Sequence, residues 1–270
     1  MTPPTDSATG DARPAPGDAA ASSGPRVLVF VATYNERENL PRLVEEILAH
    51  LPAADVLVID DNSPDGTGTW CDERAAGEPR LRCLHRSGKL GLGTAVLAGL
   101  HAAIDGGYDY AINLDADFSH SPAELPKLQA GMNFPDGSPR VDVMIGSRYA
   151  PGGAIEGWPL KRKVLSRGVN WLSRWWLWLS PRDCSGAYRC YRVSTLKRLD
   201  WKIPFRSTGY SFLEELLWRL ARVGATFGES PITFVERIAG ASKVNAKEAA
   251  TSLGVLLRLG LDTWLRPRSR

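Results

Sequence analysis

The chain has 270 residues, of which 43% are hydrophobic, enough to build one full core and one catalytic-sized domain. Its net charge of +3 hides an asymmetry: Lys and Arg number 12 against 22 Asp and Glu in residues 1–157, and 21 against 8 in residues 158–270. The longest apolar tract near the C-terminus, residues 253–265, contains Arg258 and Asp262 and is too short to cross a bilayer, which excludes a transmembrane helix there.

The charge asymmetry favours an acidic front that holds a cation and a basic rear that meets phosphates or an anionic membrane. A merely solvated basic face is the alternative. Residues 1–25 are rich in Ala, Pro, Ser and Gly and predict a disordered tail, not a signal peptide, ahead of one domain over residues 26–270. The four cysteines match no zinc or redox spacing, so we interpret them as packing residues in a reducing compartment.

From residue 27 onward, short β-rich apolar runs alternate with helical patterns. Strands are predicted at residues 27–32, 56–59, 81–84, 110–114, 141–145 and 226–234, and helices at 40–50, 94–103, 209–223 and 247–265. This alternation predicts an α/β fold with a mostly parallel central sheet flanked by helices.

Polar residues follow the carboxyl ends of successive strands, which is where open α/β sheets bind ligands. No G-x-G-x-x-G follows the first strand and no P-loop motif occurs, so dinucleotide-binding and P-loop folds lose their main support.

Asp115-Ala116-Asp117 directly follows the strand at 110–114. Two carboxylates at this spacing can share a divalent cation with the diphosphate that it bridges. Ser119 is positioned to add an oxygen ligand, although a helix cap ahead of Pro122 is equally consistent with its position.

Two further strand ends carry polar groups. Asp61 can accept hydrogen bonds from a ribose or a base, or form an Asx turn. Tyr34 can stack on a base and Glu36 can hold a ribose, or both can cap the next helix.

Several ordered blocks resemble family 2 glycosyltransferases, in particular the dolichyl-phosphate (polyprenol monophosphate) mannosyltransferase branch in its short form without transmembrane segments. The resemblance spans about residues 27–260 and rests on the segments at 33–40, 60–67, 91–95, 115–120, 146–149, 183–186 and 240–243. Ala32 and Ala241 stand where the family usually has Pro and Glu. The resemblance implies a GT-A, Rossmann-like nucleotide-diphospho-sugar transferase fold.

It also implies an activity: inverting transfer of mannose from GDP-mannose to a polyprenyl or dolichyl phosphate. A UDP-sugar donor giving polyprenyl-phosphate glucose, or a non-catalytic nucleotide-sugar-binding subunit, remain alternatives. The cofactor is expected to be Mg²⁺ or Mn²⁺ on Asp115, Asp117 and Ser119, and no nucleic acid is expected as a partner.

The donor is expected to contact a set of residues at the strand ends and in a later basic loop: Ala32, Tyr34, Glu36, Ile59, Asp61, Asp115, Ala116, Arg237 and Lys243. Arg237 and Lys243 flank a Gly-containing loop that could close over the diphosphate or be a plain basic loop. Asp117, Arg148 and Glu215 are the candidate catalytic residues, with Glu215 orienting sugar hydroxyls.

An acceptor phosphate is largely dianionic at neutral pH and needs no strong general base. Arg148, Arg162 and Ser166 are the candidate groups that hold it, and each Arg could otherwise be a surface charge. Direct displacement by this phosphate predicts inversion at the anomeric carbon.

A lipid acceptor requires contact with a membrane, and residues 158–180 and 247–266 are candidate surface helices. Trp171, Trp175 and Trp178 fall on one side of the first, although packing in the core is as consistent with the pattern. Arg266, Arg268 and Arg270 could anchor the second. We expect a cytoplasmic enzyme at the cytoplasmic face of a membrane, with a small membrane-protein partner as an option.

Overall fold

A computed structural model describes residues 24–207, 209, 211–236 and 246–265, with side chains described up to 236 and again from 251. The strands are β1 (Val27–Thr33), β2 (Ala54–Asp60), β3 (Leu81–His85), β4 (Tyr110–Asp115), β5 (Val143–Ser147), β6 (Ala154–Glu156), β7 (Arg189–Arg192), β8 (Phe227–Pro231) and β9 (Thr233–Val235). The helices are α1 (Leu40–His50), α2 (Thr67–Ala75), α3 (Leu92–Asp105), α4 (Leu125–Ala130), α5 (Leu160–Leu177), α6 (Val193–Leu196), α7 (Phe212–Arg222) and α8 (Ala246–Leu265), with a 3₁₀ turn at Pro122–Glu124.

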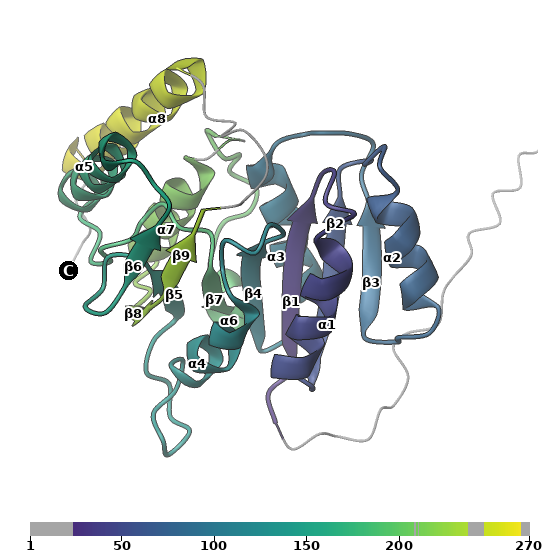
Figure 1. The fold of residues 1–270 in the computed structure, drawn as a ribbon. Coiled ribbons are helices and arrows are strands. Elements are labelled where there is room, and N and C mark those ends of the chain that lie inside the picture. The colour runs from purple at the N-terminus through teal and green to yellow at the C-terminus, as the bar shows by residue number, and fades with distance from the viewer. Residues whose placement is uncertain (1–23, 208, 210, 237–245, 266–270) are drawn as a thin grey trace, which may run out of the picture.

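One seven-stranded sheet runs through the molecule in the order β3-β2-β1-β4-β7-β5-β8 (Figure 1). Every pairing in it is parallel except the two made by β7, which is antiparallel to β4 and to β5. The expected α/β class with a mostly parallel sheet is confirmed. β6 and β9 form a separate two-stranded parallel sheet.

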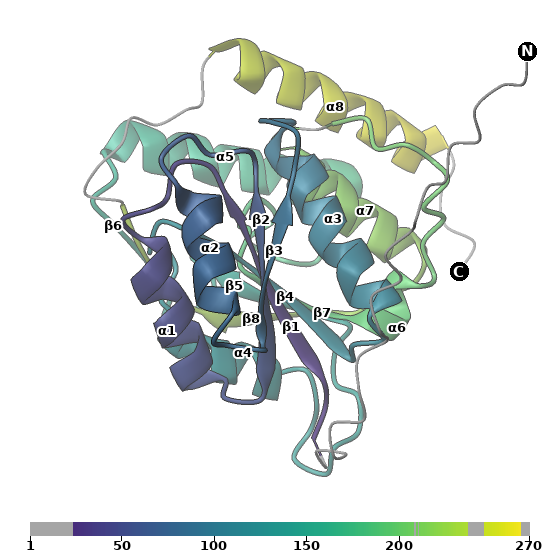
Figure 2. The same cartoon turned by 90° about the vertical axis from the view of Figure 1, so that its right-hand side faces the viewer.

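Helices cover both faces of the large sheet (Figure 2). Alternate residues of β1 point to opposite faces, as strand geometry requires. Val27, Val29 and Val31 pack in one core with α1, α2 and α4, whereas Leu28 and Phe30 pack in the other with α3, α6 and α7. This two-sided burial explains why the strands read as nearly continuous apolar runs.

The sequence missed one strand, and one expected strand differs from the structure. β7 was not predicted, because its four residues, Arg-Cys-Tyr-Arg, lack an apolar run. Arg189 is fully buried there and donates to the carbonyls of Leu213 at 2.8 Å and Cys184 at 2.6 Å. The single strand predicted at 226–234 is two strands in two sheets, interrupted at Ile232.

α5 and α8 lie side by side at one end of the molecule, beyond the sheet (Figure 1). Trp176 of α5 donates its indole N–H to the Leu257 carbonyl of α8 at 3.2 Å. A Cβ at Gly260 would lie 1.6 Å from Trp176 Nε1, so the close approach of the two helices requires glycine at this position. Within the described residues, no helix combines the length and the apolar character needed to cross a bilayer.

Candidate active site

The loops after β1, β2 and β4 meet at one edge of the sheet because these strands are adjacent and parallel. Each loop contains one non-glycine residue in the left-handed region: Asn35 (φ 59°), Asn62 (φ 57°) and Phe118 (φ 59°). Asn adopts this conformation readily, but for Phe it costs of order 1–3 kcal/mol. Backbone strain of this kind gathers at functional sites, so the three loops mark a candidate site.

The two aspartates after β2 have different surroundings. Asp60 accepts hydrogen bonds from the Ser63 backbone N–H at 2.9 Å and from Thr33 Oγ1 at 3.0 Å, so the Asx turn belongs to Asp60. Asp61 instead pairs with Arg86 Nε at 3.1 Å. Burial raises the pKa of Asp61, and the nearby Arg86 cation only partly opposes that effect. Asp61 is therefore a buried hydrogen-bond acceptor next to a cation.

The other expected donor contacts lie along the same edge. Ala32 pairs with Ile59 on one side and with Asp115 on the other. The Tyr34 ring lies 4.6 Å from Lys89 Nζ, and one Glu36 oxygen accepts from Asn39 Nδ2 at 2.8 Å. The structure thus brings these residues together, and Glu36 also stabilises the start of α1.

The D-x-D segment ends β4. Asp117 Oδ1 accepts from the Ser119 backbone N–H at 3.0 Å, and Ala116 is buried. The cap of the following 3₁₀ turn is Ser121, whose Oγ accepts from the Ala123 N–H, so Ser119 does not cap it. Ser119 Oγ is buried and has no hydrogen-bond partner among the described residues.

These residues fit a divalent cation. Two carboxylates and a hydroxyl are hard oxygen donors of the kind that Mg²⁺ and Mn²⁺ prefer, and they lie at the strand-end edge. A buried hydroxyl left without a partner is costly unless a ligand or water satisfies it. Asp115, Asp117 and Ser119 are therefore the residues that could hold the metal.

His120 adds a group to which the sequence assigned no role. It is 2% exposed, and its Nδ1 lies 3.5 Å from Asp115 Oδ2. Burial, with the Arg148 cation as a smaller cause, lowers the pKa of His120 to about 4, so the imidazole is neutral at pH 7. Its ring packs against the rings of Tyr188 and Phe234, next to the D-x-D segment.

Arg148 follows β5 and is almost fully buried. Its Nε and Nη2 each donate to one oxygen of Asp183 at 2.7 Å, and Nη2 also donates to Ser185 at 2.8 Å. Burial alone would raise the pKa of Asp183, but the Arg148 cation and its hydrogen bonds outweigh burial and hold it below 3.8. Arg148 is thus an anchored cation, not a surface charge, and it interacts electrostatically with Asp115.

The other two expected acceptor residues lie on α5, facing the same region. Arg162 forms an ion pair with Glu236 and lies with its guanidinium 4.0 Å from the centre of the Trp158 ring. Ser166 Oγ accepts from the Tyr149 hydroxyl at 2.7 Å. Tyr149 is the neighbour of Arg148, so the structure brings the expected acceptor set together.

Two adjacent carboxylates of α7 differ sharply. Both oxygens of Glu215 are engaged by protein groups, Oε1 by Arg219 at 2.6 Å and Oε2 by the Arg206 N–H at 2.8 Å. Glu215, which was expected to orient sugar hydroxyls, is therefore bound by neighbouring protein groups at α7. Burial raises the pKa of Glu214 to about 7, and its Oε2 has no hydrogen-bond partner among the described residues. Arg237 and Lys243, the expected lid residues, lie outside the described residues.

The sequence is similar to known proteins over most of its length. The sequence model of the family Glycosyl transferase family 2 matches residues 28–220. An undecaprenyl-phosphate mannosyltransferase of Micrococcus luteus is 41% identical over 246 residues, which cover 91% of this chain and 98% of that protein. A polyprenol monophosphomannose synthase of Mycolicibacterium smegmatis is 42% identical over 83% of this chain and 84% of its own length.

Solved structures share the fold at lower identity. A glucosyl-3-phosphoglycerate synthase of Mycobacterium tuberculosis, in complex with Mn²⁺ and UDP-glucose, matches with a TM-score of 0.60 at 19% identity, covering 87% of this chain and 79% of that one. A mannosyltransferase of Pyrobaculum calidifontis, in complex with GDP-Man and Mn²⁺, matches with a TM-score of 0.56 at 18% identity, covering 91% and 65%. These two likenesses support the GT-A-like fold.

Proposed function

The chain belongs to glycosyltransferase family 2, and from this membership we propose that it transfers mannose from GDP-mannose to the phosphate of a polyprenyl monophosphate, releasing GDP. The observation that carries this proposal is the meeting, at one sheet edge, of the D-x-D carboxylates and the anchored Arg148 cation. A nucleotide diphosphate and a phosphate acceptor are the two anionic partners that such a site can hold together.

On the donor side, the loops after β1 and β2 hold the nucleoside. Ala32 and Ile59 offer backbone groups, while Asp61 and Glu36 offer carboxylates to ribose or base. Asp115, Asp117 and Ser119 hold the divalent cation. When bound, that cation neutralises the charge that builds on the departing diphosphate.

On the acceptor side, the acceptor phosphate itself attacks the anomeric carbon, because it is a dianion and needs no base. Arg148 supplies a fixed positive charge next to this path, held by Asp183 so that no reorganisation is required during the reaction. Arg162 and Ser166 line the approach from α5, and the neutral His120 lies beside Asp115. The C–O bond to the new phosphate forms as the bond to GDP breaks, so the configuration inverts.

The decisive experiment incubates the purified chain with polyprenyl phosphate, Mg²⁺ or Mn²⁺, and either GDP-mannose or UDP-glucose. We expect GDP release from GDP-mannose, a β-linked mannosyl phosphate, and loss of activity with a chelator. UDP release from UDP-glucose alone would overturn the donor assignment, and a product of retained configuration would overturn direct displacement.

We further propose that the paired helices α5 and α8 contact the membrane surface that contains the acceptor, at the cytoplasmic face. Four tryptophans are exposed on these two helices and the turn that ends α5: Trp171 (65%), Trp175 (55%), Trp178 (46%) and Trp264 (46%). Their rings adjoin, with Trp171 stacked on Trp175 and Trp264 against Trp175 and Trp178. Both helices also carry exposed leucines: Leu160, Leu165, Leu253, Leu257, Leu261 and Leu265.

The same two helices carry several basic side chains, which suits the anionic surface of a bilayer: Lys161, Arg162, Lys163, Arg167, Arg174 and Arg258. We expect the protein to co-sediment with anionic vesicles and the double variant Trp171→Ser/Trp175→Ser to lose most of that binding. Phe134→Ser, which removes an equally exposed aromatic ring elsewhere, is the matched control. Equal binding of all three proteins would contradict this surface.

A further inference from the structure

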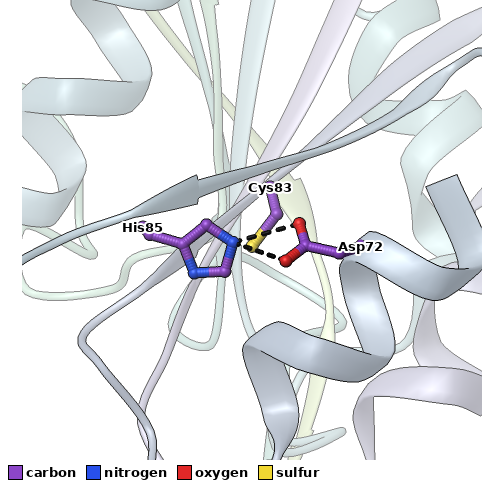
Figure 3. Close-up of side chains that lie close together, drawn as sticks. All are labelled: Asp72, Cys83 and His85. Carbon is purple, nitrogen blue, oxygen red and sulfur yellow. Dashed lines mark hydrogen bonds and ion pairs between the residues drawn. The ribbon is translucent and has the colours of Figure 1, made fainter.

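A second cluster of metal-binding side chains lies at the edge of the sheet, away from the D-x-D segment. Asp72 of α2 and Cys83 and His85 of β3 point toward one another (Figure 3). Their donor atoms all lie within 4.8 Å of one another, the one such group of three among the described residues. We call these three residues the edge cluster.

The local structure explains the convergence. Cys83 and His85 are two residues apart in β3, so their side chains share the face that α2 covers. Asp72 follows Cys71, which is fully buried under the same strand. β3 is the outermost strand and pairs only with β2, so α2 and the edge strand are held together here by side chains.

The ion pair within the edge cluster does not account for the thiol. His85 Nε2 lies 3.0 and 2.9 Å from the two Asp72 oxygens, but both side chains are half exposed or more, and such pairs contribute little to stability. Cys83 lies beside them (Figure 3), and its thiol interacts with that of the buried Cys71. The cluster therefore presents a sulfur, an imidazole nitrogen and a carboxylate to one point in space.

This donor set selects a borderline cation over a hard one. Zn²⁺ accepts thiolate, imidazole and carboxylate ligands at bond lengths of about 2.0–2.3 Å, whereas Mg²⁺ takes oxygen ligands. Ligand atoms around tetrahedral zinc are then about 3.3–3.8 Å apart. The donor atoms of the edge cluster, at most 4.8 Å apart, would have to approach by up to about 1–1.5 Å, while the His85–Asp72 contact at 2.9 Å would lengthen slightly. The exposed Asp72 and His85 can make that movement while Cys83 stays fixed in the strand.

The other ring nitrogen of His85, Nδ1, faces Gly68. A Cβ at Gly68 would lie 3.1 Å from His85 Nδ1 and 2.9 Å from Asp60 Oδ2, so the ring and this carboxylate both close over the glycine. Asp60 interacts electrostatically with His85, and carboxylates around a metal-bound histidine commonly raise its basicity as a ligand. Asp60 also holds Thr33 and Ser63, which connects the edge cluster to the donor loops.

We propose that Asp72, Cys83 and His85 bind one Zn²⁺ ion with water as the fourth ligand, clamping α2 onto the edge strand. The thiol proton of Cys83 passes to solvent when the metal binds. This zinc is structural and separate from the cation of the transfer reaction, and the inference does not depend on the proposed substrate.

Cobalt(II) tests the proposal because a cobalt–thiolate bond gives a charge-transfer absorption that oxygen ligands cannot give. The full chain is stripped with a chelator, kept reduced with a phosphine, and titrated with Co²⁺ in excess Mg²⁺. We expect one equivalent to produce charge-transfer and tetrahedral bands, both displaced by one equivalent of Zn²⁺. Zn²⁺ should also raise the melting temperature.

Variants locate the signal. Cys83→Ser should abolish the charge-transfer band, and Asp72→Asn or His85→Gln should weaken Co²⁺ binding about tenfold or more. His50→Gln, at an exposed histidine of α1, and Asp117→Asn should leave the band unchanged. Circular dichroism verifies that each variant is folded. A missing band in the wild type, or a band that survives in folded Cys83→Ser, would overturn the proposal.

Discussion

The two sides of the strand-end edge are built differently. On the proposed donor side, formed by the loops after β1, β2 and β4, Asp115 ends β4 and Asp117 follows two residues later, so chain connectivity positions these two carboxylates. Asp61, one residue after β2, is also paired with the buried Arg86. On the acceptor side, long-range pairs do so: Arg148 binds Asp183, 35 residues away, and Arg162 binds Glu236, 74 residues away. The D-x-D segment should therefore tolerate loss of a charge structurally, whereas the acceptor side should not.

The largest expected effect is structural and lies on the acceptor side. Asp183→Asn leaves Arg148 as an unpaired buried cation, and we expect the free energy of unfolding to fall by about 3–5 kcal/mol in urea titrations. Arg148→Met should cost a similar amount, and the double variant should cost less than the two together. Glu46→Gln, in the exposed pair with Arg42, should change stability by less than about 1 kcal/mol.

The same kind of change on the donor side should affect activity alone. Asp117→Asn removes a ligand charge from a partly buried position just after β4, so we expect kcat to fall about 10²–10³-fold with little change in the free energy of unfolding. GDP release measures the first and a urea titration the second. Asp105→Asn, at the exposed end of α3, serves as control, and full activity of Asp117→Asn would refute the metal assignment.

A pH series tests Glu214, a buried carboxylate of α7 that, unlike Asp61 after β2, forms no ion pair among the described residues. The pKa of Glu214 rises from 4.5 to about 7 on folding, so the folded state binds more protons between these values and stability falls as pH rises through them. Glu214→Gln should match wild type near pH 4.5 and exceed it by up to about 3 kcal/mol at pH 8. Exposed Glu38→Gln should track wild type throughout, and a pH-independent Glu214→Gln difference would contradict this account.

The smallest expected effect concerns α8. Gly260→Ala places a methyl group inside the Trp176 ring contact and should lower stability by about 1–3 kcal/mol. Gly254→Ala, in the same helix with open space around it, should instead raise stability by up to about 1 kcal/mol through helix propensity. Thermal unfolding distinguishes the two, and equal shifts would show that α8 does not depend on this close contact.

The sequence predicted the donor side well because its signals are local. Apolar runs that end in Asp60-Asp61 or Asp115-Ala116-Asp117 carry both the strand and its site in one segment, so α/β class and strand-end placement followed. The sequence also identified Arg148, but not its partner. Asp183 lies in a loop, and nothing in its neighbours indicates that it faces a residue 35 positions earlier.

Other features depended on packing that no short window contains. β7 is a strand because β4 and β5 flank it, although its own residues include two arginines. The cysteines, which match no zinc spacing, include one that meets a histidine and an aspartate only where α2 covers β3.

The sequence by itself determined the α/β class, the carboxylates at the strand ends and the family, because each is written in contiguous residues whose chemistry does not depend on distant partners. Only the tertiary structure decided that Arg148 is an anchored ion pair, that Glu215 is bound within α7, and that Asp72, Cys83 and His85 converge. Each of these depends on burial and on contacts between segments far apart in the chain, which are properties of the packed molecule.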